Sequence, residues 1–203
     1  KIDLKTNNIS MLNPEGEIYC IFPDRNNKNI LWLGTEGQGI IRFNTKTLNF
    51  RNYFNKPPFT SDSIIGNSVY FIKNDKVGNF FIGTNSGLNV ISVDNRKCKF
   101  YKHNPNNSFS LMNGFIMAFF IDPDNNIWLG SDIGGLAKFD RENDIFIRYT
   151  NSLSDTNSIS SNNVFSIYED SKGRFWISTD NGLNLMDRKK GSFSKITVTD
   201  GLP

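Results

Sequence analysis

The sequence has a single histidine and only two cysteines, and this scarcity excludes several kinds of site. His103 follows a predicted fourth strand, where we expect it to be solvated rather than a general base, and a single histidine cannot form a multi-histidine metal centre. Cys20 and Cys98 have neither metal-ligand spacing nor the density of a disulfide framework, so we expect packed thiols on different strands. We therefore predict no metal, no cofactor and no catalysis by this chain.

Long apolar runs and long cationic runs are also missing. No stretch approaches the roughly 18 apolar residues of a membrane-spanning helix. The chain begins Lys1-Ile2-Asp3-Leu4, which is neither an initiator methionine nor a signal peptide, so we expect that something upstream has been removed. The net charge of +3 comes from scattered residues, and the longest cationic run is residues 188–190. We expect no nucleic-acid partner, because such binding needs a concentrated basic stripe.

Helical periodicity is the third absence. No window repeats apolar residues at helical spacing without glycine or asparagine intervening, which favours an all-β chain. Aromatic residues, by contrast, make up 13% of the sequence and include 18 phenylalanines. That content and the length of 203 residues predict a folded chain with a sizeable core rather than a disordered tail.

A short motif of an aromatic residue, an aliphatic residue and a glycine or serine recurs about every 48 residues. Its copies are Trp32-Leu33-Gly34, Phe81-Ile82-Gly83, Trp128-Leu129-Gly130 and Trp176-Ile177-Ser178. An apolar residue lies twelve positions upstream in three copies (Val69, Ile116, Val164) and fourteen upstream in the first (Ile18). The register therefore holds across four copies.

Each copy reads as four short strands joined by turn residues. An apolar first strand runs into an aspartate (Asp24, Asp75, Asp122 or Asp170), and the strand with the aromatic motif returns. Third strands are expected at 40–43, 88–93, 136–139 and 183–186, and fourth strands carry Phe50, Cys98, Phe146 and Phe193. This pattern predicts a β-propeller rather than a β-sandwich, which has no reason to repeat every fourth strand. The predicted blades are 18–67, 68–114, 115–162 and 163–203, after a leader or preceding blade end at 1–17.

The recurring pattern resembles the two-component regulator propeller repeat. The copy from Val164 to Asp187 (VFSIYEDSKGRFWISTDNGLNLMD) is nearest to V-x-x-I-x-x-D-x-x-G-x-x-W-I-G-T-x-x-G-L-x-x-F-D, and the resemblance extends from residue 18 to the end. Phe81 in place of tryptophan, Ser178 in place of glycine and about two extra residues near 91–92 depart from it.

The resemblance implies the extracytoplasmic sensor region of a hybrid two-component histidine kinase of the Bacteroides type. It further implies an arc of a larger, about seven-bladed ring, a periplasmic location and a homodimer formed through the full ectodomain. The ligand implied is a glycan-derived oligosaccharide that controls carbohydrate-utilisation genes. The membrane would be reached only through downstream segments, and the kinase modules are absent from this chain.

Candidate ligand-binding residues lie in the loops that a propeller gathers at one mouth of its channel. They are Glu36, Gln38, Asn85, Asp132 and Asp180 between second and third strands, and Asn67, Asn113, Phe115, Asn162 and Asn163 before first strands. Carboxamides and carboxylates suit sugar hydroxyls, and an aromatic loop residue suits a sugar ring. The recurring aspartates are interpreted as turn residues and the tryptophans as inter-blade core. A propeller lyase or other carbohydrate-active enzyme, and a protein-interaction scaffold, are the alternative functions.

Overall fold

The computed structural model describes residues 2–3, 8–9, 16–24, 27–53, 64–92 and 97–201. Within these ranges the only helical element is the short 3-10 turn η1 (Val198–Asp200), and every other regular element is a β-strand. No helix in the described part of the chain is long and apolar enough to cross a membrane. The predicted all-β class is confirmed.

Four antiparallel sheets follow one another along the chain, each with its four strands in sequence order. Their strands are β3 (Ile18–Pro23), β4 (Ile30–Thr35), β5 (Ile40–Asn44) and β6 (Phe50–Tyr53); β7 (Val69–Asn74), β8 (Phe80–Thr84), β9 (Gly87–Ile91) and β10 (Cys98–Tyr101); β11 (Ile116–Ile121), β12 (Ile127–Ser131), β13 (Leu136–Asp140) and β14 (Ile145–Tyr149); β15 (Val164–Glu169), β16 (Phe175–Thr179), β17 (Gly182–Asp187) and β18 (Ser192–Ile196). Ahead of them, β1 (Ile2–Asp3) pairs with β2 (Asn8–Ile9). The predicted blade limits fall in the connections between sheets and stay predictions.

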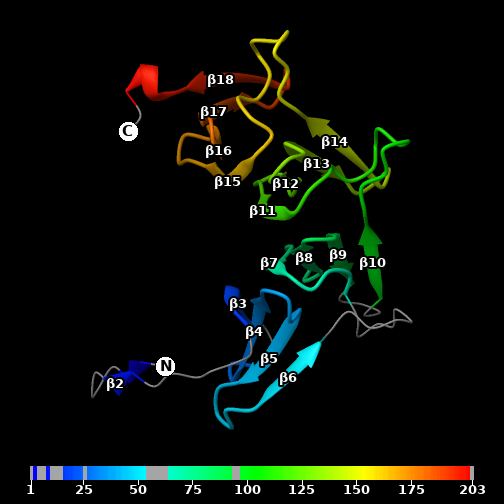
Figure 1. The fold of residues 1–203 in the computed structure, drawn as a ribbon, viewed down its shortest axis with the longest axis vertical. Coiled ribbons are helices and arrows are strands. Elements are labelled where there is room, and N and C mark those ends of the chain that lie inside the picture. The colour runs from blue at the N-terminus through cyan, green and yellow to red at the C-terminus, as the bar shows by residue number, and fades with distance from the viewer. Residues whose placement is uncertain are drawn as a thin grey trace.

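The sheets stand side by side as propeller blades, with the first strand of each innermost (Figure 1). Contacts between neighbouring blades join β3 to β7, β7 to β11 and β11 to β15, and each second strand also contacts the next innermost strand. The four blades form an open arc in Figure 1 rather than a closed ring. The arc of four four-stranded blades is confirmed, while the total of about seven blades stays a prediction.

The glycine of the recurring motif lets neighbouring blades approach closely. A Cβ atom at Gly83 would overlap both the Phe71 ring and the carbonyl oxygen of Ile116 in the next blade. A Cβ at Gly130 would lie 2.5 Å from Cγ1 of Val164, again in the next blade. Ser178 stands at the matching place in the fourth blade, where no further blade follows in the described chain.

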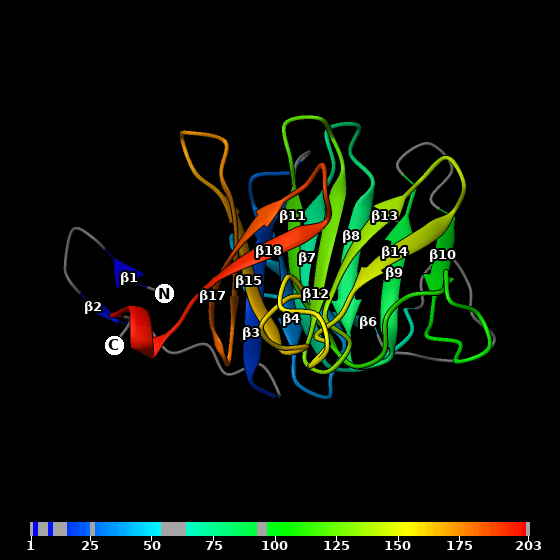
Figure 2. The ribbon, with the colours of Figure 1, turned by 90° about the horizontal axis from the view of Figure 1, so that it is seen from above.

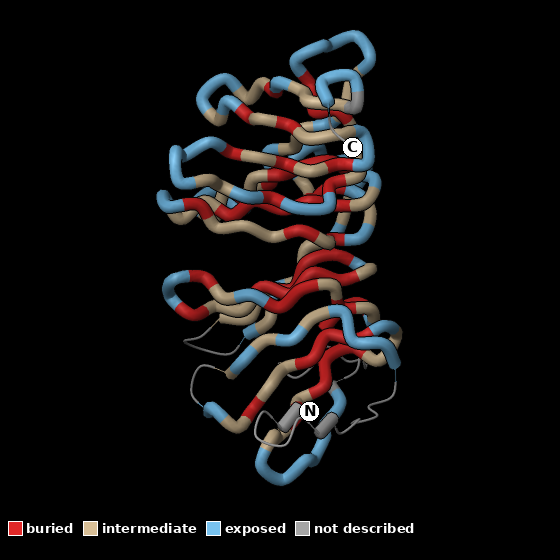
Figure 3. The backbone as a smooth tube through the Cα atoms, turned by 90° about the vertical axis from the view of Figure 1, so that its left-hand side faces the viewer, coloured by how far each residue is buried: buried red, intermediate tan, exposed pale blue. Residues whose placement is uncertain are grey.

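Most of the described core lies between blades, since three hydrophobic clusters each join two neighbouring blades. A fourth cluster, with Leu33, Ile41 and Phe43, belongs to the first blade alone. Buried segments run through the middle of every sheet (Figure 3). Between the third and fourth blades, Trp128 packs with Val164, Phe175 and Ile177, all nearly or fully buried. Each such side chain contributes about 1.5–3 kcal/mol of hydrophobic stabilisation relative to exposure. The interpretation of Trp128 as inter-blade core is confirmed.

The two end blades leave apolar residues uncovered. Ile18 is 39% exposed, whereas Val69, Ile116 and Val164 occupy the same place in the other blades and are fully buried. At the other end Tyr168 is exposed and Trp176 is only half-buried, although the equivalent Trp128 is buried. Both end faces therefore have the composition of an inter-blade face, as expected for an arc of a larger propeller.

The two cysteines are free thiols on different strands, as predicted. Cys20 faces Gly34 within the first blade and lies 4.0 Å from the carbonyl oxygen of Val69 in the second. Burial raises the pKa of both thiols, that of Cys98 to about 11. Neither thiol is poised as a nucleophile, because the reactive form is the thiolate.

Candidate functional site at the mouth of the blades

The two ends of the blades carry different connections. The turns between the first two strands of each blade, such as residues 122–126, lie at the top of Figure 2. The loops between second and third strands, and the connections from one blade to the next, lie at the bottom. We call this second end the mouth face, and the structure brings all ten sequence-predicted ligand residues to it.

Each innermost strand begins with a β-bulge at its second residue, where the register with the second strand shifts. The bulged residues are Tyr19, Tyr70, Met117 and Phe165. A bulge redirects a side chain out of the regular alternation of a strand. Large side chains are thereby presented at the mouth end of every innermost strand.

Three aromatic rings stack in a row across the first three blades. Tyr19 and Tyr70 lie 5.5 Å apart between ring centroids with an interplanar angle of 10°, and Tyr70 and Phe115 lie 5.7 Å apart at 19°. Tyr19 and Phe115 remain 42% and 43% exposed. We call these three residues the aromatic row; it is a strip of apolar surface that stays in contact with solvent.

Sequence reasoning identified Phe115 in this row and missed both tyrosines. Tyr19 and Tyr70 sit inside strands whose flanking residues are apolar, so a strict alternation gives them no special direction. The available signal was the recurrence of a large residue directly after the first apolar residue of each innermost strand. The bulge that turns these residues toward the mouth is invisible in the sequence.

Two carboxylates flank the aromatic row. Desolvation raises the pKa of Tyr19, and a hydrogen bond with Glu36 and its charge raise it further. Desolvation also raises the pKa of Tyr70, followed by the charges of Asp132 and Glu36. Tyr70 therefore lies within electrostatic reach of both carboxylates, one from the first blade and one from the third.

Three of the predicted loop residues also form hydrogen bonds with the residues just before the innermost strand of their own blade. Asp132 Oδ1 accepts the backbone N–H of Phe115 at 2.7 Å. Asn85 Oδ1 accepts the N–H of Asn67 at 3.1 Å, and its Nδ2 donates to Asn67 Oδ1 at 3.0 Å. Asp180 accepts from Asn163 Nδ2 at 3.4 Å. These positions are equivalent from blade to blade, so they share a structural role besides any contact with a ligand.

Three further predicted residues, Asn162, Gln38 and Asn113, lie on the same face, and their contacts described below are with residues outside the aromatic row. Asn162 accepts the N–H of Asn151 through its side chain and that of Gly135 through its carbonyl oxygen. The side chain of Gln38 lies beside Gly16. Asn113 is exposed, with its backbone against Gly134. The structure therefore groups Glu36, Phe115 and Asp132 with the two tyrosines.

On the opposite face the recurring aspartates hold their turns, as predicted. Asp122 accepts the N–H of Asn126 at 2.8 Å and the indole N–H of Trp128 at 3.1 Å. Asp170 likewise accepts from Trp176 at 3.0 Å. In the second blade, where phenylalanine replaces tryptophan, Asn79 Nδ2 donates to Asp75 at 2.8 Å, as Asn126 Nδ2 does to Asp122 at 2.9 Å in the third blade.

An arginine from the following blade then binds two of these aspartates. Arg141 Nη1 lies 2.9 Å from Asp75, and Arg188 Nη1 lies 3.1 Å from Asp122. Burial alone would raise the pKa of Asp75 and Asp122, but hydrogen bonds to each carboxylate and the arginine charge keep both below the ordinary value. These aspartates are structural groups with satisfied partners.

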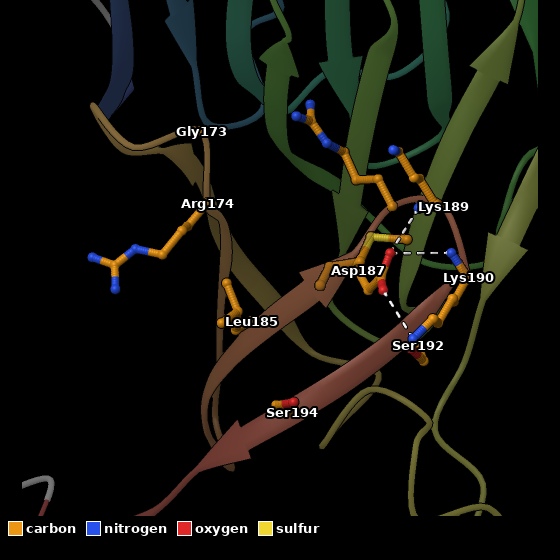
Figure 4. Close-up of a pocket in the computed structure, with 10 residues that line it drawn as sticks. Gly173, Arg174, Leu185, Asp187, Lys189, Lys190, Ser192 and Ser194 are labelled. Atoms are coloured by element: carbon orange, nitrogen blue, oxygen red, sulfur yellow. Dashed lines mark hydrogen bonds and ion pairs between the residues drawn. The ribbon is translucent and has the colours of Figure 1, made fainter.

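A shallow groove of about 510 Å³ lies on the fourth blade, next to its uncovered face (Figure 4). Its cations are mostly paired: Arg174 with Asp170 at 2.6 Å, and Lys190 with Asp187 at 3.7 Å. Arg174 also points away from Lys189 and Lys190 in Figure 4. The groove therefore offers no converging set of charges.

Metal binding has no candidate centre in the described part of the chain. Those residues contain no group of three or more histidine, cysteine, aspartate or glutamate side chains that could hold a metal. His103 Nδ1 lies 3.0 Å from the carbonyl oxygen of Leu111, within the connection to the third blade. The imidazole thus contacts the connection that leads to Phe115.

Comparison with known proteins finds a family model that matches two segments of this chain. The model of the two-component regulator propeller matches residues 110–132 and 158–181. A protein named histidine kinase P4 from Formosa agariphila is 36% identical over 81 residues, which are 40% of this chain and 6% of that protein. The chain therefore spans only a small part of the length of this relative.

Solved structures share the fold. The extracellular domain of a protein described as a hybrid two-component system of B. thetaiotaomicron is similar to 89% of this chain, with a TM-score of 0.60 and 20% identity, over 30% of its own length. A streptogramin B lyase is similar to 92% of this chain, with a TM-score of 0.60 and 14% identity, over 56% of its own length. The same architecture thus occurs in proteins of different function. The predicted resemblance to the two-component regulator propeller repeat is thus confirmed at residues 110–132 and 158–181, in the third and fourth repeats.

Proposed function

We propose that this chain is a non-catalytic, ligand-sensing segment of the propeller of a membrane hybrid two-component sensor. The matched repeats and the similarity to a histidine kinase and to an extracellular sensor domain support this role. In this proposal the chain lies outside the cytoplasmic membrane, in the periplasm, and the kinase and regulator modules belong to other parts of the protein. The homodimer expected from the resemblance is part of the same proposal.

The ligand in this proposal is a glycan-derived oligosaccharide, whose recognition would control carbohydrate-utilisation genes. The observation that carries it is the aromatic row, which stays exposed between Glu36 and Asp132. Sugar rings present apolar C–H faces that pack on aromatic surface, and their hydroxyls donate to carboxylates. An exposed aromatic surface beside acceptors has both halves of that chemistry.

Signalling in this proposal depends on movement of whole blades or propellers. Neighbouring blades are joined by buried contacts and by the Arg141–Asp75 and Arg188–Asp122 ion pairs, so a blade does not deform independently. A ligand that bridges three blades would therefore act on how rigid units pair rather than on one loop. Such a response transmits binding without any chemical step.

The enzymatic alternative lacks a favourable observation. A lyase needs a converging acid–base or metal set, and the described residues contain no group of three or more side chains that could hold a metal. The ionisable groups beside the aromatic row are Glu36 and Asp132, which come from different blades. The interaction-scaffold alternative would use the same face, where Ile133 and Phe165 are also exposed. A sugar and a protein partner are separated by the experiment below.

The test is a thermal-shift screen of the 203-residue chain with a panel of glycan oligosaccharides. A ligand that binds only the folded state stabilises it, by about 2.7 kcal/mol when the ligand concentration is a hundred times its Kd. This added stability raises the melting temperature. We expect at least one saccharide to raise it in the wild-type chain and not in Tyr70→Ala. No shift with any saccharide would contradict the proposed ligand. The matched control is Tyr168→Ala, which removes an exposed tyrosine outside the aromatic row.

A further inference from the structure

The charges on the mouth face are strongly one-sided. The acidic residues of its described loops and connections are Glu17, Glu36, Asp132, Asp155, Asp180 and Asp200. Within the same described segments, Lys102 is the only lysine or arginine. The turns of the opposite face mix both signs and contain Arg141, Arg174 and the run 188–190. An approaching ligand therefore meets a negative surface only at the mouth.

Glu36 and Asp132 place two of these charges directly beside the aromatic row. Asp132 Oδ1 already accepts the Phe115 N–H, but a carboxylate offers about four acceptor sites and so keeps capacity for a ligand. Glu36 is exposed, and its backbone N–H donates to the carbonyl oxygen of Glu17, two residues before Tyr19, at 2.8 Å. Both groups accept hydrogen bonds and attract cations, and both repel a second carboxylate or a sulfate.

We infer that the mouth selects saccharides without acidic groups, and that a protonated amine on the sugar strengthens binding. This inference rests on the proposed saccharide-sensing function and adds the class of sugar to it. Hydroxyl and ammonium donors find acceptors at Glu36 and Asp132, while the rings of the aromatic row take the apolar sugar faces. A uronic or sulfated sugar would bring a like charge to a face whose described loops hold six carboxylates and one lysine. The Arg148 side chain also reaches this face, where it donates to the carbonyl oxygens of Asn107 and Ser108.

Two variants remove the charge while keeping the shape of the site. Asp132→Asn preserves the backbone bond to Phe115, because in the second blade Asn85 Oδ1 accepts the N–H of Ser68, the residue equivalent to Phe115, at 3.3 Å. Glu36→Gln keeps an acceptor near Tyr19. Glu142→Gln is the matched control, since it makes the same charge change in an exposed turn on the opposite face.

The experiment measures the Kd of oligosaccharides of equal length from three classes: neutral glucose oligomers, glucosamine oligomers and galacturonate oligomers. We expect glucosamine oligomers to bind about tenfold tighter than neutral ones at low salt, and galacturonate oligomers to show no binding. The Asp132→Asn and Glu36→Gln chains should lose the advantage of the amine and keep the neutral affinity. Glu142→Gln should behave as the wild type.

The outcomes separate this inference from the proposed function. Galacturonate binding as tight as neutral binding, with loss in Tyr70→Ala, would overturn the charge selectivity and leave the saccharide site standing. An amine advantage that survives both mouth variants would also overturn it. Absence of binding in all three classes would overturn the selectivity together with the proposed saccharide ligand.

Discussion

Arg188 reaches back across a blade boundary, and its Nη1 lies 3.1 Å from Oδ2 of Asp122 in the third blade. The Asp122 side chain is almost fully buried, and the same arginine also binds Glu169 at 2.8 Å. The relationship repeats one blade earlier between Arg141 and Asp75. We call these two ion pairs, Arg141–Asp75 and Arg188–Asp122, the latch. The latch recurs with the repeat and joins successive blades on the face opposite the mouth.

Arg188→Gln should destabilise the chain, because it leaves a buried carboxylate without its charged partner. A loss of about 1–3 kcal/mol is expected for a charged hydrogen bond to a buried group, and the partial exposure of Arg188 places it at the lower end. Thermal melting followed by circular dichroism measures it. Lys190→Gln is the control, since its 3.7 Å pair with Asp187 is exposed and should change stability by less than about 1 kcal/mol. Equal losses in the two variants would contradict the latch.

Acid should unfold the chain through the latch aspartates. The folded-state pKa values of Asp75 and Asp122 lie below the ordinary value, so their contribution is complete above roughly pH 4 and is lost as the pH falls further. The melting temperature should be level from about pH 7 to pH 5 and fall below about pH 4. Asp122→Asn should melt lower at neutral pH and show a shallower fall in acid. An unchanged acid slope in that variant would contradict this assignment.

Trp128 and Trp176 occupy equivalent positions, yet their replacement should have different costs. Trp128 is 2% exposed between two blades, so Trp128→Ala should cost about 3–5 kcal/mol. Trp176 lies on the uncovered face of the fourth blade, and Trp176→Ala should cost clearly less in this 203-residue chain. Equilibrium unfolding in urea compares the two. Similar costs would mean that the fourth blade's outer face is covered in solution.

The close approach of blades at Gly83 gives a further stability prediction. Gly83→Ala would push a methyl group into the Phe71 ring and the Ile116 carbonyl, so we expect a large loss of stability or failure to fold. Gly173→Ala is the control, because nothing lies within 4 Å of its Cβ position and only the positive φ of +73° opposes it, at about 1 kcal/mol. Expression yield and melting temperature report the difference. A Gly83→Ala chain as stable as Gly173→Ala would contradict the inter-blade packing.

The repeat made most of the fold predictable from sequence. The positions of Val69, Ile116 and Val164 relative to the aromatic motif fixed the strand register, because each blade buries the same residue against its neighbour. The turn role of Asp122 followed from hairpin chemistry. The limits of the predicted third strands differ by one or two residues. Three strands are longer than predicted: β5 (Ile40–Asn44), β13 (Leu136–Asp140) and β17 (Gly182–Asp187). By contrast, β9 (Gly87–Ile91) begins one residue earlier and stops at Ile91, and Val93 lies outside the described residues.

The candidate site was less predictable. Loop position identified Glu36, Asp132 and Phe115, because a propeller gathers those loops at one face. Tyr19 and Tyr70 escaped notice because a bulge, not the strand alternation, brings their rings to the mouth. The latch partners of Asp75 and Asp122 also come from a neighbouring blade, and a contact across 66 residues of chain leaves no local signal.

The central claim is that the aromatic row binds an oligosaccharide, and Tyr70 is its middle ring. Isothermal titration of the wild-type chain, Tyr70→Ala and Tyr168→Ala with a saccharide selected by thermal shift tests it most directly. We predict that Tyr70→Ala weakens the Kd at least about tenfold, which is a loss of about 1.4 kcal/mol of binding free energy, and that Tyr168→Ala leaves the Kd unchanged. Equal affinity in all three chains would contradict a ligand site at the aromatic row.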